Sequence, residues 1–156
     1  METPLRSFIV EELTEKDLKW FVEVAAVNML IYEVRRPELV HMDNLYRLAN
    51  LGMTGGTAFI VKCKGENAGA LGSILLPNLF NPNIKTMAEI FWYVLPEYRM
   101  TRAGAMLLNA FNKKASEISD ESTLCLMGSS EINIKTLEKR GFHLGEYAFR
   151  KAYGVI

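Results

Sequence analysis

The chain has 156 residues, of which 49% are hydrophobic and 23% charged, a composition typical of one folded domain with a sizeable core. Lysine and arginine together number 18 and are balanced by 18 acidic residues, so the sequence lacks the basic excess of most nucleic-acid-binding proteins. We therefore expect a single domain over residues 1–156 and no nucleic-acid partner.

The first part of the chain predicts a strand and then a helix. Residues 5–12 are β-prone and predict the strand. Thr14 and Asp17 form a capping-box pattern, which predicts that a helix begins there. Apolar residues recur at helical spacing as far as Tyr32, so the helix should bury that stripe and end before Pro37.

The rest of the chain predicts a second helix and then a run of strands. In chain order we expect a helix at 37–51, strands at 57–63, 68–76 and 88–95, a helix after the next turn, a strand at 122–127, a helix at 132–140 and a strand or hairpin at 142–153. The sequence GMTGG should end the first of these helices, and Gly141 the last. The order β-α-α-β-β-β-α-β-α-β(-β) favours an α/β fold, with a mixed sheet between helices on both faces.

The sequence carries no targeting, membrane-spanning or metal-binding signal. Its start lacks the long apolar run of a signal peptide, and the most apolar helical stretch is interrupted by Glu23 and Asn28. Cys63 and Cys125 lie in apolar stretches, without a second cysteine or a histidine at metal-ligand spacing. We expect a cytoplasmic protein with buried, reduced thiols, no metal and no membrane partner.

The sequence LPEYRMTRAGAML, at 95–107, runs from an apolar strand into a helix through a short turn. The first N–H groups of a helix lack partners and, with the helix dipole, favour an anion. Arg99 and Arg102 add positive charge, and the small residues at 103–105 let a ligand approach the backbone. On local chemistry alone, an ordinary turn with two solvated arginines is an equal alternative.

This junction resembles the signature of a known family. The sequence VLPEYRMTRAGAMLL is similar to the signature segment of the GNAT superfamily of N-acetyltransferases. The sequence LEKRGF, at 137–142, resembles the late helix-to-strand motif of that family, and the predicted element order is also the family's order. The resemblance covers nearly the whole chain. It implies the GNAT fold and the direct transfer of acetyl from acetyl-coenzyme A to an amine, without a covalent enzyme intermediate.

The resemblance also implies where the cofactor binds. It assigns the pyrophosphate of acetyl-coenzyme A to backbone N–H groups at the helix start, those of Met100, Thr101, Arg102, Ala103, Gly104 and Ala105. One amide of the preceding strand end would stabilise the oxyanion of the tetrahedral intermediate. The backbone of that strand end would pair with the pantetheine arm, through Trp92, Tyr93 and Val94.

Two positions depart from the family pattern. Arg102 stands where the family usually has glycine, so its side chain must point away from the pyrophosphate or bind a phosphate. This variant resembles one in small acetyltransferase-like proteins of bacteriophages and predicts a phage or mobile-element origin. Leu137 stands where many members carry the tyrosine that acts as general acid for the departing thiolate. Tyr147 is the candidate replacement, and the alternative for it is a half-buried hairpin tyrosine.

The acceptor amine also needs a base, because an ammonium group must lose its proton before it attacks. Glu89 is the best candidate, since it lies in the central strand that should line the acetyl group. It also resembles the base glutamate of histone-type members of the family. The alternative is a strand-end carboxylate in water or paired with a lysine such as Lys85.

Three interpretations follow for the function. The first is an acetyl-coenzyme A-dependent N-acetyltransferase whose acceptor is a small-molecule, protein or modified nucleobase amine. The second is a protein that keeps this fold as a binding or inhibitor module, because Arg102 and Leu137 depart from the catalytic pattern. The third is the subunit of a structural homodimer. The polar stretch 32–43 lies where this family usually shapes acceptor specificity.

Overall fold

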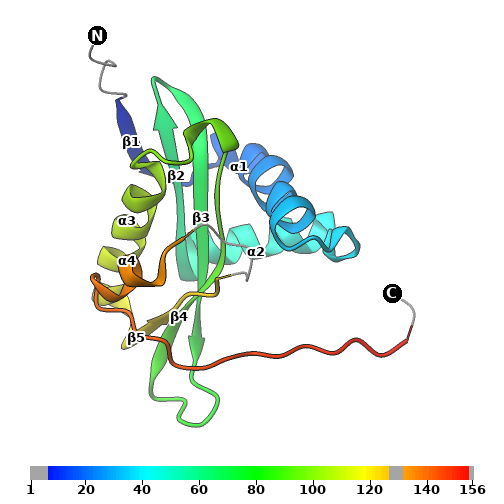
Figure 1. Cartoon of the computed structure of the whole chain (residues 1–156), viewed down its shortest axis with the longest axis vertical. Helices are drawn as coiled ribbons and strands as arrows, with labels where there is room; N and C mark the ends of the chain where they lie inside the picture. The colour runs from blue at the N-terminus through cyan, green and yellow to red at the C-terminus, as the bar shows by residue number, and fades with distance from the viewer. Residues whose placement is uncertain (1–6, 127–131, 155–156) are drawn as a thin grey trace. The chain divides into compact units, whose positions relative to one another are not determined.

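The computed structural model describes residues 7–126 and 132–154. The chain divides into two compact units, Met1–Cys125 and Leu126–Ile156. Within the described residues, the first unit holds a five-stranded sheet with helices on both faces, and the second holds one short helix (Figure 1). No helix in these ranges is long and apolar enough to cross a membrane. The single domain over 1–156 stays a prediction.

The sheet of the first unit has the strand order β1-β2-β3-β4-β5 in the described residues. Its strands are β1 (Phe8–Glu12), β2 (Gly56–Cys63), β3 (Glu66–Pro77), β4 (Lys85–Val94) and β5 (Glu121–Thr123). The first three pairings are antiparallel, and β5 runs parallel to β4. A tight turn joins β2 to β3, with Lys64 at φ 52° and Gly65 at φ 82°. The predicted mixed sheet is confirmed.

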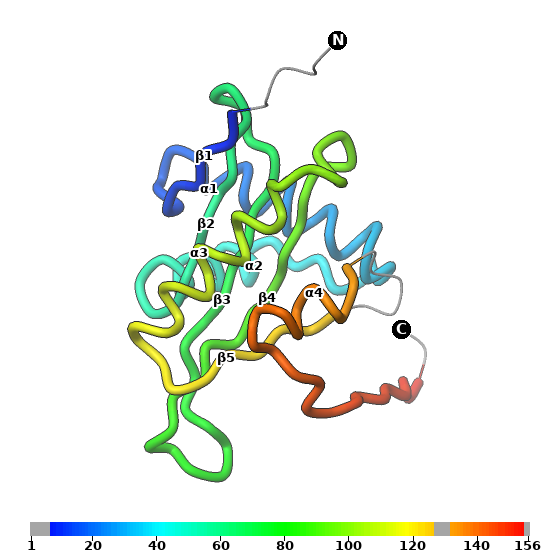
Figure 2. The backbone as a smooth tube through the Cα atoms, turned by 60° about the vertical axis from the view of Figure 1, so that its left-hand side comes forward, coloured from blue at the N-terminus to red at the C-terminus, as the bar shows by residue number. Residues whose placement is uncertain are grey.

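Helices cover both faces of this sheet (Figures 1 and 2). One face carries α1 (Glu15–Trp20), the π-helical segments η1 (Phe21–Ala26) and η2 (Met29–Glu33), the short helix η3 (Pro37–Leu39) and α2 (Met42–Gly55). The other face carries α3 (Ala103–Ile118). Phe21 and Phe91 meet edge to face in the first of these layers, with ring centroids 4.7 Å apart. On the α3 side, Leu107 and Phe111 are fully buried, and each such side chain contributes about 1.5–3 kcal/mol.

The first helix is wound differently from the prediction. After α1 the chain is largely π-helical, and the N–H of Val34 reaches the carbonyl of Met29 at 2.9 Å. A π-helical turn holds more residues than an α-helical turn, so later side chains are shifted around the helix axis. Tyr32 was expected on the buried stripe and is 66% exposed. The helix ends in a left-handed residue, Arg35 at φ 59°, before Pro37 as predicted.

The predicted capping box at the start of α1 does not form. Thr14 precedes the helix, but its side chain makes no capping hydrogen bond. Asp17 instead binds the ammonium group of Lys62 at 3.0 Å, which ties α1 to β2. Burial alone would raise the pKa of Asp17, but hydrogen bonds from Lys62 and Asn67 and the Lys62 charge hold that pKa below its usual value.

The second helix runs further than the prediction, because α2 ends at Gly55 rather than at Leu51. Gly52 lies inside the helix, close to the sheet. A Cβ at this position would lie 3.0 Å from the carbonyl oxygen of Thr57 and 3.3 Å from that of Ser73. The glycine-rich sequence therefore permits a close approach between helix and strands and does not end the helix at its first glycine.

The second unit departs most from the predicted elements. Its helix α4 (Ile134–Glu138) lies within the predicted range and is followed by Gly141 at φ 88°, as expected for a glycine that stops a helix. The strand or hairpin expected at 142–153 is wrong, because this stretch forms no strand. Nearly all of its side chains are exposed, so no buried face selects a strand register.

Candidate functional site

The second half of β4 has one unpaired side. β5 pairs with β4 only at 86–88, opposite 121–123, so it is shorter than the predicted strand at 122–127. Over Glu89–Val94, no described residue forms a strand on that side, and only β3 pairs with β4. We call this unpaired side of Glu89–Val94 the open edge. Its backbone N–H and C=O groups can pair with an extended ligand.

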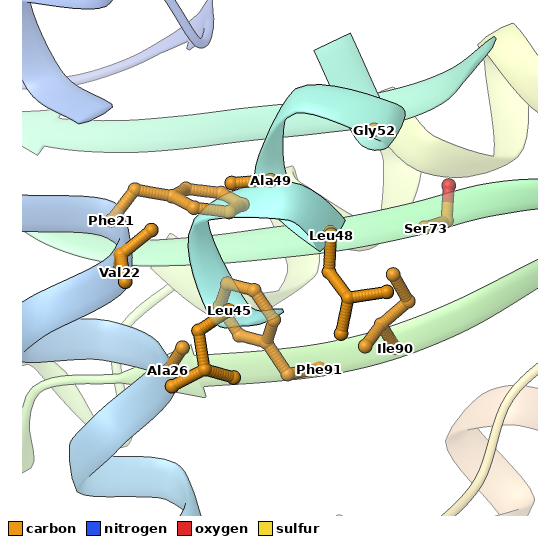
Figure 3. A pocket seen from close by; sticks show the side chains of 11 residues that line it. Phe21, Val22, Ala26, Leu45, Leu48, Ala49, Gly52, Ser73, Ile90 and Phe91 are labelled. Carbon is orange, nitrogen blue, oxygen red and sulfur yellow. The ribbon is translucent and has the colours of Figure 1, made fainter. Parts of the chain in front are cut away.

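A β-bulge lies where the open edge begins. Glu89 and Phe91 pair with consecutive residues of β3, so Ile90 is an extra residue in β4. As a result, the consecutive side chains of Ile90 and Phe91 both point toward α2, into a small cavity (Figure 3). The alternation of the strand then places Glu89 on the opposite face, which is also the face of Trp92.

The cavity in Figure 3 is a packing gap in the core. It lies between η1, α2, β3 and β4, and Ser73 carries the only polar side chain of its described wall. The Ser73 hydroxyl already accepts a hydrogen bond from the Thr57 N–H at 3.1 Å and bonds the Thr57 hydroxyl. The cavity therefore presents no free polar group to a ligand, and the open edge is the better candidate site.

Glu89 is the first residue of the open edge, and its side chain is half-buried. Its Oε2 accepts a hydrogen bond from the N–H of Cys125 at 3.2 Å. Burial raises the pKa of Glu89 to about 7, and this hydrogen bond limits the rise. Such a carboxyl group exchanges protons near neutral pH, as a general base must. The alternative ion pair with Lys85 does not form among the described residues, and the role of base stays a prediction.

The two cysteines differ from each other in exposure. Cys63 is buried in β2, as expected. Cys125 was also expected to be buried, but it is exposed, because β5 ends two residues before it and no described strand continues there. Its backbone amide, rather than its thiol, makes the hydrogen bond to Glu89.

The turn between β4 and α3 is held by its own hydrogen bonds. It contains the short helix η4 (Pro96–Tyr98) and Met100 at φ 64°, a left-handed conformation that is uncommon outside glycine. The Thr101 hydroxyl donates to the carbonyl of Tyr98 and accepts from the N–H of Ala103 at 3.2 Å. Thr101 therefore caps the start of α3 with its side chain.

The first turn of α3 has backbone donors without acceptors. The N–H of Ala103 is bound by the threonine cap, and that of Met106 reaches the Arg102 carbonyl at 3.0 Å. The N–H groups of Gly104 and Ala105 find no acceptor among the described residues. Of the six amides predicted to bind the pyrophosphate, that of Ala103 is occupied, and these two lie in the first turn of α3, where the helix dipole favours an anion.

The two arginines of the turn have different surroundings. Arg102 is exposed and forms no ion pair with a described residue, so its charge is free at the helix start. Arg99 donates from Nε to the Val94 carbonyl at 3.0 Å and from Nη2 to the Glu33 carboxylate at 2.7 Å. Its guanidinium also lies 5.5 Å from the centre of the Tyr93 ring. The positive charge predicted to serve a phosphate is thus already paired with Glu33.

The side chains of the strand end divide between the two faces of the sheet. Tyr93 is buried in the core beneath α1 and α2. Trp92 and Val94 face the start of α3, where a Cβ at Gly104 would lie 3.7 Å from the Trp92 ring and 3.6 Å from Val94 Cγ2. The indole N–H of Trp92 is buried and has no acceptor among the described residues. A buried donor without a partner is uncommon in folded proteins, so this N–H is a candidate donor to an acceptor atom of a ligand at this junction.

These features fit an extended ligand that ends in a diphosphate. The open edge offers backbone groups to the amides of a pantetheine arm. The start of α3 offers the N–H groups of Gly104 and Ala105 and the Arg102 guanidinium to phosphate oxygens. The Val94 carbonyl keeps a second lone pair beside its bond from Arg99. The described residues contain no cluster of three or more His, Cys, Asp or Glu side chains that could hold a metal.

The two positions considered for the general acid lie in the second unit. Leu137 is buried in α4. Tyr147 is 76% exposed and lies outside any strand, so it is not the half-buried hairpin tyrosine of the alternative interpretation. Its role as general acid stays a prediction.

Sequence reasoning missed two side chains that shape this site. Thr101 was predicted only as an amide donor, although a threonine shortly before a helix is a recognisable capping signal. Glu33 was not singled out within the polar stretch 32–43. Its position depends on π-helical winding, which leaves no periodicity signal in the sequence.

Solved structures match this fold along nearly the whole chain. An aminoglycoside acetyltransferase from an uncultured soil metagenomic sample, solved with trehalose, is 16% identical with a TM-score of 0.71, covering 96% of this chain and 97% of that one. A predicted acetyltransferase from Clostridium acetobutylicum, solved with acetyl-CoA, is 15% identical with a TM-score of 0.74, covering 94% and 96%. A transcriptional regulator from Bacillus halodurans C-125 is 15% identical with a TM-score of 0.72, covering 94% and 100%.

Comparison of the sequence finds no match for this chain, whereas comparison of the structure does. No protein-family model matches the sequence, and no curated protein matches it. The structural matches nevertheless extend over the described sheet and its helices. The chain therefore has the fold of the GNAT acetyltransferases, as the signature segment predicted.

Proposed function

We propose that this protein is an N-acetyltransferase that moves the acetyl group of acetyl-coenzyme A directly to an amine. One observation carries the proposal: the open edge of β4 is followed, after the turn at 95–102, by a helix start with unpaired amides. Glu89 lies at one end of this path, and Gly104 and Ala105 lie at the other. An extended arm that joins a thioester to a diphosphate matches this order of groups.

The chain's own residues would hold the cofactor mainly through backbone. The open edge at Trp92, Tyr93 and Val94 would pair with the pantetheine amides. The N–H groups of Gly104 and Ala105 would bind the diphosphate, with Arg102 as the side-chain donor. Acetyl-coenzyme A supplies the acetyl thioester when it is bound. Two bound forms in similar folds support this assignment: acetyl-CoA in the Clostridium acetobutylicum protein and a CoA bisubstrate analog in AAC(6')-Iy.

Glu89 would act as the base for the acceptor. Because its pKa is about 7, a large part of it is ionised at neutral pH, and the carboxylate accepts the proton that the attacking amine loses. A backbone N–H of the open edge stabilises the oxyanion as the C–N bond forms and the C–S bond breaks. The departing thiolate takes a proton from Tyr147 or from water.

The acceptor is a small-molecule or protein amine. Two proteins with this fold, both from uncultured soil metagenomic samples, are aminoglycoside acetyltransferases, so aminoglycosides are the first class to screen. The polar stretch 32–43, which includes Glu33, is the proposed source of acceptor specificity. We further propose a cytoplasmic protein, a phage or mobile-element origin and a homodimer as the assembly to test.

A second candidate is a binding or inhibitor module that keeps the fold without catalysis. The buried Leu137 favours it, since this apolar side chain replaces the expected acid. The regulator from Bacillus halodurans has the same fold, which is consistent with functions other than acetyl transfer. The two candidates differ in turnover: only the enzyme releases free coenzyme A when an amine is added.

A thermal-melt comparison with and without acetyl-coenzyme A tests the cofactor site first. Ligand at a hundred times its dissociation constant should stabilise the fold by about 2.7 kcal/mol, which raises the melting temperature by roughly 5–10 °C in a domain of this size. Acetyl-pantetheine, which lacks the diphosphate, is the matched control and should shift the melt much less. The absence of any shift with acetyl-coenzyme A would overturn the proposal.

Product analysis then separates the enzyme from the binding module. The protein is incubated with acetyl-coenzyme A and a panel of aminoglycosides, polyamines and lysine peptides. Free thiol and acetylated product are measured by absorbance and mass spectrometry. Cofactor binding without product from any acceptor would favour the second candidate.

A further inference from the structure

Glu33 lies at the end of η2 and contacts Arg99, a residue far from it in the sequence. Its Oε1 accepts a hydrogen bond from Nη2 of Arg99 at 2.7 Å. The two residues are 66 positions apart in the chain. Their side chains are 28% and 32% exposed, so water screens the pair only in part. This ion pair joins the first helical layer to the turn that precedes α3.

The guanidinium of Arg99 is bound through two of its three nitrogens. Nε donates to the carbonyl of Val94, the last residue of β4, while Nη2 is bound by Glu33. The guanidinium plane also faces the Tyr93 ring at 5.5 Å. The side chain therefore connects the end of the open edge to η2.

The backbone beside Arg99 needs such support. The next residue, Met100, is left-handed at φ 64° and 97% exposed, so its own side chain makes no contact that could hold it there. A non-glycine residue in this conformation is strained and persists only where its surroundings determine it. On one side Arg99 is anchored by its side chain, and on the other Thr101 is anchored by its cap.

The π-helical winding explains why Glu33 reaches this position. Glu33 is the last residue of the second of two π-helical segments, whose winding shifts its side chain around the axis relative to an α-helix. The end of the helix is then closed by two hydrogen bonds, from the Val34 N–H to Met29 and from the Arg36 N–H to Leu30, each at 2.9 Å. The carboxylate is thus placed by backbone geometry rather than by a flexible loop.

We propose that Glu33 is a positioning residue for the cofactor turn, residues 95–102. It acts through Arg99, which it holds against the end of β4, and so fixes the left-handed Met100 and the amides that follow in their binding conformation. This inference rests on the proposed function, because it assumes that these amides bind a diphosphate. It also assigns Arg99 a structural contact in place of the phosphate contact expected from the sequence.

The test measures the dissociation constant of coenzyme A by calorimetry, well below the melting temperature, for the full chain and its variants. Glu33→Ala should raise the dissociation constant about tenfold, and Glu33→Gln, which keeps one acceptor oxygen, about two- to fivefold. The matched control is Glu12→Gln. It removes another long-range ion pair, that of Glu12 with Lys114 at 2.9 Å, which does not touch the cofactor turn. The control should bind coenzyme A like the wild type.

A purely structural role would lower the melting temperature of the ligand-free protein and leave the affinity of the folded protein unchanged. Equal affinity in the wild type and both Glu33 variants would therefore overturn the inference and leave the proposed function intact. Tighter binding by Glu33→Ala would also overturn it, because Arg99 would then be a phosphate ligand that Glu33 withholds. If the wild type itself fails to bind coenzyme A, the proposed function falls and the inference falls with it.

Discussion

The two halves of β4 differ in what lies along their outer side. Thr86–Ala88 is paired by β3 on one side and by β5 on the other, and Thr86 donates its hydroxyl hydrogen to Glu121 at 2.6 Å. Glu89–Val94 is paired by β3 alone within the described residues. The bulge at Ile90 separates the two halves. One strand therefore stabilises the sheet at its start and presents binding groups at its end.

One substitution in each half of β4 tests this difference. The substitution at Glu89 should have the largest effect on kcat, and the one at Thr86 is its control. Glu89→Gln should lower kcat by about 10²–10⁴-fold, because glutamine cannot accept the amine's proton. Thr86→Val removes one hydrogen bond in the paired half and should leave kcat within about twofold. The wild-type rate should rise with pH as Glu89 ionises near pH 7 and then level off, whereas the Glu89→Gln rate should be flat. Steady-state kinetics over a pH series measures both. Equal losses in the two variants would contradict the distinction.

A pair of substitutions at the helix start tests whether the open edge continues into an anion site. The space beside Gly104 admits a methyl group at ordinary contact distance from Trp92 and Val94. Gly104→Ala should keep coenzyme A affinity and add about 1 kcal/mol of helix stability. Gly104→Leu should fill the space at the junction and weaken binding at least tenfold, and calorimetry on both proteins checks this. Circular dichroism shows whether the leucine variant is folded, and unchanged affinity in a folded leucine variant would refute the site.

The ionisation of Glu89 should also appear in the stability of the protein. The folded pKa, about 7, lies above the ordinary value of 4.5. The favourable contribution of the protonated carboxyl is therefore complete at acid pH and is lost as the pH rises through about 7. Glu89→Gln has no such loss. It should melt close to the wild type in acid and a few degrees higher in alkaline solution, as differential scanning calorimetry can measure. A constant difference at all pH values would show that Glu89 does not titrate in this range.

The smallest effect is expected at Tyr147, outside the open edge. Its side chain is 76% exposed in the second unit. If water protonates the thiolate, Tyr147→Phe should change kcat by less than about threefold, because an exposed hydroxyl is readily replaced by solvent. Stopped-flow or steady-state rates with acetyl-coenzyme A decide the matter. A loss of more than tenfold would identify Tyr147 as the general acid and would show that the second unit contributes to catalysis.

Local patterns in the sequence predicted most of the first unit. The apolar run at 88–95 indicated a central strand; the structure has β4 there at 85–94, paired with β3 along its length but with β5 only at 86–88. Alternation and turn residues located β2 and β3 in the same way. The strand or hairpin at 142–153 failed, because β-propensity has no effect where no buried face receives the side chains. The predicted capping box also failed: the Thr14 side chain makes no capping hydrogen bond, and the Asp17 carboxylate binds Lys62.

Only the backbone part of the candidate site, the turn and the helix start, could be predicted from the sequence. The signature segment located the turn and the start of α3, because its small residues at 103–105 permit a ligand to approach the backbone. It did not show that Arg99 binds Glu33 or that Ala103 is already capped by Thr101. Those contacts depend on where separate elements meet, and residue types near a turn carry no information about partners 66 positions away.

By itself, the sequence determined the order of the elements from β1 to α4, the position of β4 along the chain and the helix start that follows the turn at 95–102. These features follow from periodicity, glycine placement and the unpaired amides of any helix start, which are local properties of the chain. The tertiary structure alone decided that β5 pairs with β4 only at 86–88, that Ile90 forms a β-bulge and that Glu33 binds Arg99. Strand length, register and long-range ion pairs depend on which surfaces are packed together, so they emerge only when distant segments meet.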